Sequence, residues 1–227
     1  MSRTRTVLSW STGKDSAWSL HVLRKNPDIE IVALVTTLNE AFNRVAMHAV
    51  RRELLEMQAT AVGIPLWTVR LPWPCSNEEY EARMSALCAR AVNEGVQAMA
   101  FGDLFLADIR AYREKQLAGT GLEPIFPVWG IPTGDLAREM IAAGLKAKIT
   151  CVDPRVLAPE FCGRDFDAQF LADLPPGVDP CGENGEFHSF VCDGPDFARP
   201  IPVSVVETVE RDGFVFSDVK ALAGRTS

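Results

Sequence analysis

Two kinds of hydrophobic pattern alternate along this chain, and their alternation is the feature that most restricts its fold. Short runs of apolar and β-branched residues predict strands, and longer segments with apolar residues at every third or fourth position predict helices. The predicted strands are Arg5–Trp10, Ile29–Thr36, Pro65–Arg70, Ala98–Gly102 and Ile125–Val128. The predicted helices are Asp15–Lys25, Met47–Val62, Glu78–Glu94 and Asp108–Ala118. This order predicts an α/β fold over residues 1–132, with a doubly wound, mostly parallel sheet covered by helices on both faces.

The regular alternation ends near residue 132. A predicted helix, Thr133–Ala143, and a strand-like run, Ala147–Val152, are followed by a stretch rich in proline and glycine, residues 153–202, which predicts ordered loops. The remaining predicted elements are a short helix near Asp165–Ala172 and a hairpin of Val203–Glu210 and Phe214–Asp218 around an Asp-Gly turn. Residues 133–227 are therefore expected to form a second, smaller, loop-rich α+β domain.

The composition argues against several classes of protein. The 30 acidic and 23 basic residues give a net charge of −7, which disfavours a broad basic face that binds duplex nucleic acid. No apolar run approaches the roughly 18 residues of a membrane span, and the first residues do not resemble a signal peptide, so we expect a cytoplasmic protein with no membrane partner. The six cysteines form no C-x-x-C pair, which predicts reduced, mostly buried thiols and no structural zinc site. The alternative is a reactive thiol at Cys162 or Cys181.

The hydroxyl-rich turn after the first predicted strand is the strongest functional signal. Its sequence, Ser-Thr-Gly-Lys-Asp-Ser at residues 11–16, leads into a predicted helix whose free N–H groups and positive dipole end favour an anion. Glycine permits close backbone approach, hydroxyls donate hydrogen bonds and lysine adds a positive charge, so we expect a phosphate group here. The candidate phosphate-binding residues are Ser9, Ser11, Thr12, Gly13, Lys14, Asp15 and Ser16. The alternative is a simple turn followed by a capped helix.

Asp15 is an unexpected residue beside a phosphate. It is interpreted either as the N-cap of the first helix or as an acceptor that orients Lys14 or a magnesium-bound water. The segment fits neither the G-x-x-x-x-G-K-[ST] pattern nor the G-x-G-x-x-G pattern, which disfavours kinase-like and dinucleotide-binding folds.

Polar residues also follow the second and fourth predicted strands, at the edge where ligands bind in such sheets. Gly102 and Asp103 would face the first loop, the glycine allowing close approach and the carboxylate holding magnesium, unless they form only a turn. Thr36, Thr37 and Asn39 would lie near adenine or ribose, unless they are ordinary polar loop residues.

Charged and proton-transferring residues complete the candidate set. Arg110 and Arg113 share a helix face and can clamp an anionic substrate or the α-phosphate, or else pair with nearby acids. His48 either assists proton transfer or only donates a hydrogen bond near the start of a helix. The carboxylates of Glu183 and Glu186 stand in a glycine-punctuated loop and can hold an amine, an ammonium or a metal ion, unless they are solvated loop acids. The candidate catalytic residues are Lys14, Asp103, Glu183, Glu186, His188 and His48.

These segments together resemble one family. Residues 11–16 are similar to the S-G-G-x-D-S pyrophosphate-binding loop of the PP-loop ATP pyrophosphatases, with Thr12 in place of the middle glycine. Other segments resemble the diphthine–ammonia ligase (diphthamide synthase) family and its bacterial relatives: Arg44–His48, Phe101–Phe105 with the two arginines that follow it, Pro127–Gly130 and Cys181–His188.

The resemblance implies a HUP-type, Rossmann-like nucleotide-binding domain followed by a family-specific domain. It also implies cleavage of ATP between its α- and β-phosphates with Mg²⁺, activation of a carboxylate as an acyl-adenylate, and conversion of that intermediate to an amide by ammonia. A bacterial member would need a carboxylate other than the diphthine of the archaeal and eukaryotic elongation factor. A homodimer is a further expectation.

Two other functions stay open at this point. A PP-loop sulfur transferase acting on tRNA would need an exposed cysteine of low pKa and a basic RNA-binding face. A sensor that binds ATP without cleaving it would need no acidic loop such as residues 183–188.

Overall fold

The computed structural model describes residues 3–45 and 50–222, and the first of its two sheets is mostly parallel. This sheet, sheet A, consists of β1 (Thr4–Ser9), β2 (Ile29–Asn39), β3 (Arg44–Val45), β4 (Leu66–Leu71), β5 (Ala98–Ala100) and β6 (Glu123–Ile125). The strands lie in the order β3-β2-β1-β5-β6, and β4 also pairs with β2. All pairs are parallel except β2 with β3, so the predicted α/β fold is confirmed.

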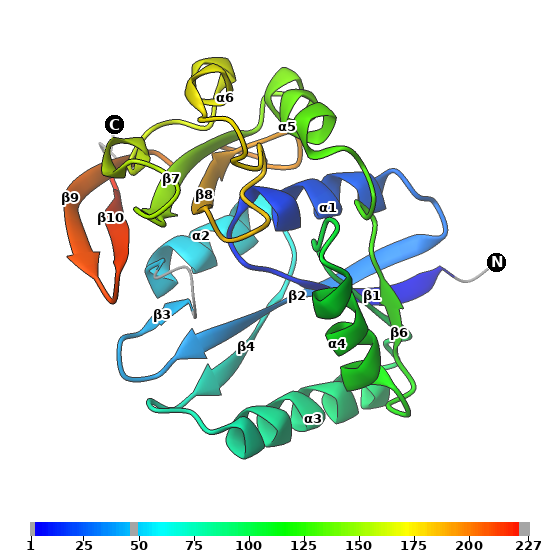
Figure 1. Ribbon diagram of the computed structural model, residues 1–227. Helices are drawn as coiled ribbons and strands as arrows, with labels where there is room; N and C mark the ends of the chain where they lie inside the picture. Colours follow the sequence, from blue (N-terminus) through cyan, green and yellow to red (C-terminus); the bar gives the residue numbers. More distant parts are fainter. Residues whose placement is uncertain (1–2, 46–49, 223–227) are drawn as a thin grey trace, which may run out of the picture.

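Helices cover both faces of sheet A (Figure 1). They are α1 (Lys14–Arg24) and α2 (Arg52–Val62) on one face, and α3 (Asn77–Asn93) and α4 (Ala107–Leu117) on the other. Successive side chains of a strand point to opposite faces. Leu8 of β1 accordingly packs in the core that contains Leu20 of α1, whereas its neighbour Val7 packs in the core that contains Met84 of α3. Burial on both faces explains why the first strands are apolar almost throughout.

The second half of the chain forms an antiparallel sheet, sheet B, with two short α-helices. Its elements are α5 (Thr133–Ala142), β7 (Lys146–Val152), a 3₁₀ turn (Pro159–Phe161), α6 (Ala168–Asp173), β8 (Phe187–Asp193), β9 (Val203–Arg211) and β10 (Phe214–Ala221). The strand order is β8-β7-β10-β9. Helix α1 lies between the two sheets (Figure 1), and its Leu20 shares one continuous core with Phe190 of β8. The two halves therefore have a common hydrophobic core.

Several predicted boundaries were wrong. Strand β8 was missed because the glycines and prolines around it suggested only loops. Helix α2 begins at Arg52 rather than Met47, since Arg51 forms a β-bridge with Arg44 before the helix starts. Strand β6 begins at Glu123, two residues before the predicted Ile125–Val128 segment, and ends at Ile125.

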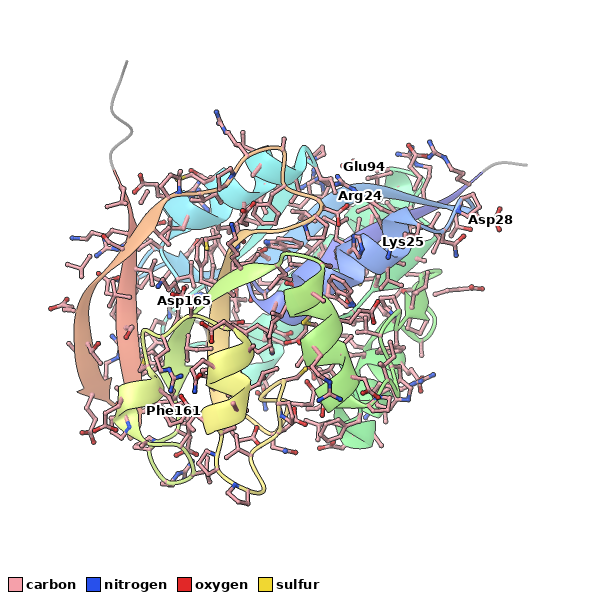
Figure 2. All side chains as sticks on the ribbon, turned by 90° about the horizontal axis from the view of Figure 1, so that it is seen from above. Arg24, Lys25, Asp28, Glu94, Phe161 and Asp165 are labelled. Atoms are coloured by element: carbon pink, nitrogen blue, oxygen red, sulfur yellow. The ribbon has the colours of Figure 1, made fainter. Side chains whose placement is uncertain are left out.

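The first turn of α1 is directed toward the second half of the molecule. Seen from above, the far end of this helix, with Arg24 and Lys25, lies on the opposite side of the molecule from Phe161 and Asp165 (Figure 2). The carboxyl end of β1 and the start of α1 therefore face the loops of the second half. Across residues 3–45 and 50–222, no helix is both long and apolar enough to cross a membrane.

Candidate functional site

A cavity of about 230 Å³ lies where the start of α1 meets the loop before β8. Three segments that are far apart in the sequence line it: Ser9, Ser11, Gly13, Lys14, Asp15 and Ser16; Phe101, Gly102, Asp103 and Arg113; and Cys181, Gly182, Glu183, Phe187, His188 and Ser189. An adjoining cavity of about 440 Å³ has Ser9, Ser11, Phe101 and Arg113 in common with the first and is also lined by Thr36 and Thr37. The fold thus brings together most residues of the predicted site.

The loop after β1 begins α1 without a side-chain cap. Gly13 is the N-cap residue, and Asp15 lies inside the first turn, so the interpretation of Asp15 as the N-cap was wrong. Ser16 Oγ donates to the carbonyl of Gly13 at 2.9 Å and lies 3.2 Å from Ser11 Oγ. Both serines line the cavity at the start of the helix, an arrangement that favours an anion, although the first helical N–H, that of Lys14, already donates to Ser189 Oγ at 3.2 Å.

Thr12 has a conformation that its side chain disfavours. Its φ angle is 73°, its side chain is fully buried outside the cavity lining, and its Oγ1 has no hydrogen-bond partner among the described residues. Its carbonyl accepts hydrogen bonds from Val191 N and from Gln58 Nε2, both at 3.0 Å. Thr12 therefore anchors the loop to β8 through its backbone, and its hydroxyl is turned away from the place predicted for phosphate.

Gln58 was not singled out in the sequence, yet it holds the loop in place. Its Nε2 also donates to the carbonyl of Val191 at 2.6 Å, and its Oε1 accepts from Trp10 Nε1 at 2.8 Å. The residue is fully buried in α2. The helical pattern around Gln58 does not predict these hydrogen bonds, because the partners Thr12 and Val191 lie 46 and 133 residues away in the chain.

Lys14 is buried rather than presented as a free cation. Its side chain is 2% exposed, and Nζ donates to Asp15 Oδ2 at 2.9 Å and to the carbonyl of Cys181. Nζ also lies 5.3 Å from the centroid of the Phe187 ring. Burial lowers its pKa, but the charge and hydrogen bond of Asp15, together with the nearby Cys181 and Glu183, outweigh burial and raise the pKa above the ordinary value. The Lys14 ammonium therefore ties the loop to the second half of the molecule.

The segment after β5 approaches the start of α1 closely. A Cβ atom on Gly102 would lie 3.0 Å from the carbonyl carbon of Asp15, a separation so tight that the backbone there would have to shift to admit a side chain. Asp103 Oδ2 lies 3.6 Å from Arg113 Nε. Burial raises the pKa of Asp103 and of Asp15, although Arg113 and Lys14 respectively act in the opposite direction. The glycine thus permits two partly buried carboxylates to line one cavity.

These two carboxylates fit a magnesium ion bound together with a nucleotide. Asp15 Oδ1 and Asp103 Oδ2 are buried, and neither has a hydrogen-bond partner in the described part of the chain. Mg²⁺ prefers oxygen ligands and is usually held by one or two carboxylates plus substrate phosphates. No group of three or more His, Cys, Asp or Glu side chains suited to a metal occurs among residues 3–45 and 50–222, so the protein alone offers no complete cage.

The structure separates the two predicted arginines. Arg113 lines both cavities, and its guanidinium lies 5.2 Å from the centroid of the Phe101 ring. Arg110 instead pairs with Glu114 at 2.8 Å and stacks over Phe126 at 4.7 Å. The alternative of a surface ion pair therefore describes Arg110, and Arg113 is the arginine of the cavity.

The loop before β8 contributes two acids in different positions. Glu183 lines the cavity, and its Oε1 accepts from Leu104 N at 2.7 Å; burial raises its pKa to about 7. Glu186 is buried outside the cavity lining, where its Oε1 accepts from Asp179 N and Asn184 Nδ2, both at 3.0 Å. Glu183 is directed to the site, whereas Glu186 holds the shape of its own loop.

Of the two histidines predicted for the site, the structure describes only His188. His188 lines the cavity, and burial together with the Lys14 charge lowers its pKa to about 4, so it is neutral near pH 7. His48 lies outside the described residues.

Thr36, Thr37 and Asn39 lie within β2, which runs to Asn39, and not after it as predicted. In the adjoining cavity, Thr36 Oγ1 donates to the carbonyl of Trp10 at 2.7 Å, which ties β2 to the first loop.

The cysteines near the second sheet are poorly suited to thiol chemistry. Burial raises the pKa of Cys151 and of Cys181 to about 12 and also raises that of Cys162. A thiolate is the reactive form of cysteine, so these side chains are inert near neutral pH. This finding disfavours the sulfur-transfer alternative.

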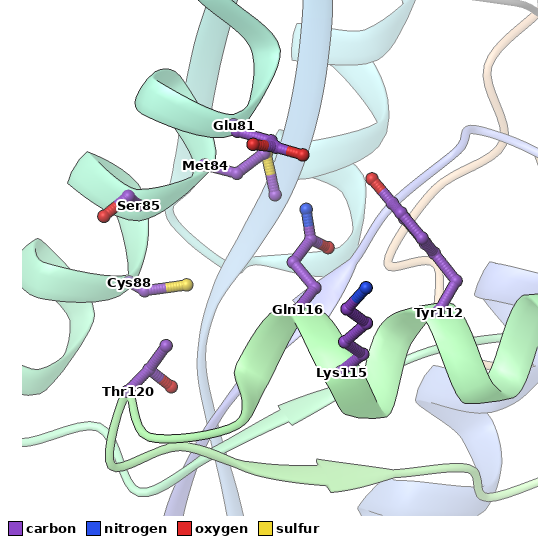
Figure 3. Close-up of a pocket in the computed structure, with 8 residues that line it drawn as sticks. All are labelled: Glu81, Met84, Ser85, Cys88, Tyr112, Lys115, Gln116 and Thr120. Carbon is purple, nitrogen blue, oxygen red and sulfur yellow. The ribbon is translucent and has the colours of Figure 1, made fainter. Parts of the chain in front are cut away.

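A further cavity of about 280 Å³ lies between α3 and α4 and was not predicted. Figure 3 shows Tyr112 and Gln116 extending from α4 toward Glu81 and Met84 of α3. Met84 also lines the cavity that contains Thr36 and Thr37, so the two spaces are neighbours.

Comparison with known proteins gives a consistent result over both halves. The diphthamide synthase N-terminal domain matches residues 4–124, and the diphthamide synthase C-terminal domain matches residues 132–221. The diphthine–ammonia ligase of Homo sapiens is 28% identical over 236 residues, which cover 93% of this chain and 87% of the relative. The diphthine–ammonia ligase of Danio rerio is 26% identical and covers 95% of this chain and 92% of the relative. This chain belongs to the diphthamide synthase family.

Proposed function

We propose that this protein is an ATP-dependent, AMP-forming ligase that adenylates a carboxylate and amidates it with ammonia. The observation that carries the proposal is the single cavity in which the α1 loop, Asp103 and the Glu183 loop meet. The relatives named diphthine–ammonia ligase support the same reaction class. The protein is therefore an enzyme of the ligase class.

The two adjoining cavities suit the two ends of ATP. The start of α1, with the hydroxyls of Ser11 and Ser16, is placed to stabilise the departing pyrophosphate, which needs positioning and electrostatic support rather than covalent chemistry. The cavity lined by Thr36 and Thr37 is placed for adenine and ribose. Arg113 lines both spaces and can therefore contact charge at the α-phosphate, where the bond breaks.

Magnesium is a proposed component of the site. Asp15 Oδ1, which has no hydrogen-bond partner among the described residues, and the Asp103 carboxylate, whose Oδ2 lies 3.6 Å from Arg113 Nε, would hold the ion, and the ion would neutralise charge on the triphosphate. The acid substrate is proposed to be diphthine, as the names of the relatives indicate, or another carboxylate if the source is bacterial. The cytoplasmic location and the homodimer stay predictions.

The test is a product analysis with ATP, MgCl₂, ammonium chloride and a panel of carboxylates that includes diphthine-bearing elongation factor. We expect AMP and pyrophosphate in equal amounts only when a suitable acid is present. ADP as the product would contradict the proposal, and no AMP with any acid would favour a nucleotide sensor. Loss of turnover when Cys151, Cys162 or Cys181 is replaced by serine would revive the thiol mechanism.

A further inference from the structure

Helices α3 and α4 cover the same face of sheet A but leave a space of about 280 Å³ between them. Neighbouring helices usually pack with interdigitated side chains, and protein interiors contain few voids larger than a water molecule. Leu117 is the one buried residue of α4, a helix that the structure describes throughout. This helix therefore turns no apolar stripe toward α3, and the two helices do not close on each other.

The space, called the α3/α4 cavity below, combines buried apolar residues with a polar wall. Met84 and Cys88 of α3 line it and are 6% and 3% exposed. The wall from α4 consists of Tyr112, Lys115 and Gln116, which share one helix face through their spacing of three and four residues. Figure 3 shows Lys115 and Gln116 extending from α4 into the space between the helices. The cavity therefore suits a molecule with an apolar body and polar ends.

The side-chain amide of Gln116 is an unused hydrogen-bond donor in this cavity. Its Nε2 atom is buried and has no hydrogen-bond partner among the described residues. A buried polar group without a partner costs free energy, and native structures satisfy nearly all such groups. A ligand that places an acceptor atom beside Gln116 would satisfy this donor.

Side chains of opposite charge stand on the two walls of the cavity. Glu81 belongs to α3 and Lys115 to α4; both are exposed, and neither has an ion-pair partner in the described part of the chain. Glu81 lies close enough to α4 to act electrostatically on Tyr112. A ligand with one charge would be attracted by one wall and repelled by the other, whereas a zwitterion would be attracted by both.

We propose that the α3/α4 cavity binds an α-amino acid with a small apolar side chain. The carboxylate of this ligand accepts hydrogen bonds from Lys115 Nζ and Gln116 Nε2, and its ammonium donates to Glu81. Its side chain lies against Met84 and Cys88. The volume of about 280 Å³ is just below the roughly 300–1,000 Å³ of sites for drug-sized ligands, which fits a molecule of this size.

The α3/α4 cavity is distinct from the two cavities proposed for ATP but shares a wall with one of them. Met84 lines both this cavity and the one proposed for adenine and ribose. Tyr112 interacts with Tyr80, which also lines the adenine side. Arg113, the next residue of α4, faces the nucleotide cavities instead. The amino acid therefore binds beside the nucleotide, and its binding does not depend on the ligase function.

The test follows the Met84 methyl signal by NMR in protein labelled with ¹³C-methyl methionine, with Met84→Leu identifying the signal. L-Leucine is the probe, and we expect a saturable shift with a Kd of about 1 mM or lower. Two analogues lack one charge each: 4-methylpentanoate has no ammonium, and 3-methylbutylamine has no carboxylate. Each should bind at least about tenfold more weakly than L-leucine. No saturable shift with L-leucine, or equal affinities for the three compounds, would overturn the proposal.

Gln116→Met gives a second readout that does not depend on charge. The substitution replaces the unpartnered amide by an apolar group of similar size. Without ligand, the variant should unfold at a higher temperature than the wild type, because a buried donor without a partner is removed. It should also bind L-leucine at least about tenfold more weakly. A variant that binds L-leucine as tightly as the wild type would contradict the assignment of this site.

Lys115→Met and Glu81→Gln test the two charged walls, and each should weaken binding of L-leucine about tenfold. The matched controls are Lys220→Met in β10 and Glu139→Gln in α5, which change exposed residues of the second half of the molecule. Both controls should bind L-leucine as the wild type does. Equal losses in the controls and in the two wall variants would show that net charge, and not this cavity, governs binding.

L-Leucine also carries a carboxylate, so its binding must be separated from binding as an acid substrate. Arg113→Met alters the nucleotide cavities and should leave the affinity for L-leucine unchanged. L-Leucine should also bind in the presence of saturating α,β-methylene-ATP. Loss of binding in Arg113→Met but not in Lys115→Met, or displacement by the nucleotide, would place the probe in the nucleotide cavities and overturn the proposal. A protein that releases no AMP in the ligase assay can still bind L-leucine, so the two proposals fail separately.

Discussion

Thr12 shows how one residue can carry strain for the sake of a loop. A β-branched residue in the left-handed region costs roughly 1–2 kcal/mol, and a buried hydroxyl without a partner costs roughly 1–3 kcal/mol. Thr12 has both problems: its φ angle is 73°, and its Oγ1 atom has no hydrogen-bond partner among the described residues. The carbonyl bonds that anchor the loop need only the backbone and would survive substitution.

Replacing Thr12 by glycine should therefore stabilise the protein. Glycine loses about 0.5–1 kcal/mol through the entropy of the unfolded chain and about 0.8 kcal/mol through the buried methyl group, which is less than the strain removed. We expect a gain of about 1 kcal/mol in the free energy of unfolding, measured by urea denaturation. Thr12→Ala keeps the strained backbone and should gain less. A Thr12→Gly variant that is less stable than the wild type would contradict this account.

The raised pKa of Glu183 has a cost to stability. A carboxyl with a pKa of about 7 in the folded protein and 4.5 when unfolded is ionised more easily in the unfolded chain. Its penalty is therefore absent below about pH 4.5, grows as the pH rises toward 7 and is constant above that value.

Glu183→Gln should remove this penalty. We expect the variant to exceed the wild type by about 2 kcal/mol at pH 8, discounted for partial exposure, and by much less at pH 4.5. Thermal unfolding at the two pH values measures the difference. An equal effect at both pH values would show that the carboxyl ionises normally in the fold.

The candidate anion-binding loop could be identified at the residue scale because the signals for it are local. Hydroxyls, a glycine and a helix start within residues 11–16 predict an anion site without any tertiary contact, and nucleotide binding there stays a prediction. The partners of Lys14 were not predictable, since the Cys181 carbonyl lies 167 residues away. Arg110 and Arg113 looked equivalent in the sequence, and only the packing of α4 assigns one to the cavity and the other to a surface pair.

At the scale of elements, the segment after β5 and the start of α1 approach each other closely, backbone against backbone. Gly102→Ala would place a Cβ atom 3.0 Å from the Asp15 carbonyl carbon, which belongs to backbone and cannot move aside cheaply. We expect a loss of about 1–3 kcal/mol in stability and roughly tenfold weaker binding of a non-hydrolysable ATP analogue, measured by calorimetry.

Gly134→Ala is the control for this substitution. Gly134 lies in the first turn of α5, where an added Cβ would meet only the end of the Arg138 side chain at 3.6 Å. Because alanine favours helix more than glycine does, this variant should be slightly more stable and bind the analogue normally. Equal effects of the two substitutions would show that the close approach at Gly102 has no bearing on the site.

The central strands β1 and β2 of sheet A were predictable because they are largely buried on both faces, whereas the two-residue edge strand β3 was not predicted. Their apolar runs are continuous, and the helices between them have clear spacing. Strand β8 carries the same kind of apolar pattern, Phe187–Asp193, but it follows a turn-rich segment whose composition dominated the prediction. The pairing of β8 with β7 joins residues up to 47 positions apart, which local composition does not reveal.

At the scale of the whole molecule, a charge cluster joins sheet B to the start of α2. Asp218 of β10 accepts from Arg44 Nη1 at 3.0 Å and from Arg51 Nε at 3.1 Å. Burial raises the pKa of Asp218, but the bonds from the two arginines outweigh burial and lower it below the ordinary value of 3.8. The stabilisation is therefore present above about pH 3.8 and is lost as the pH falls further.

Asp218→Asn should weaken the contact between β10 and the start of α2 and so destabilise the protein. Both arginines would lose the Asp218 charge, and we expect a loss of about 3 kcal/mol at pH 7, which decreases as the pH falls below 3.8 toward 3. Chemical denaturation at both pH values measures this. Asp212→Asn, in the exposed turn between β9 and β10, is the control and should be nearly neutral. A pH-independent loss for Asp218→Asn would point to packing rather than charge.

The hydrogen bonds of Gln58 bear on how such an enzyme can change over time. One amide joins the loop after β1, the helix α2 and the strand β8. Its bond across the two halves goes to the backbone carbonyl of Val191, which a residue of any type at that position would offer. A chimaera that takes its first half, with Gln58 and Trp10, from one relative and its second half from another should therefore keep this bond as long as β8 keeps its position.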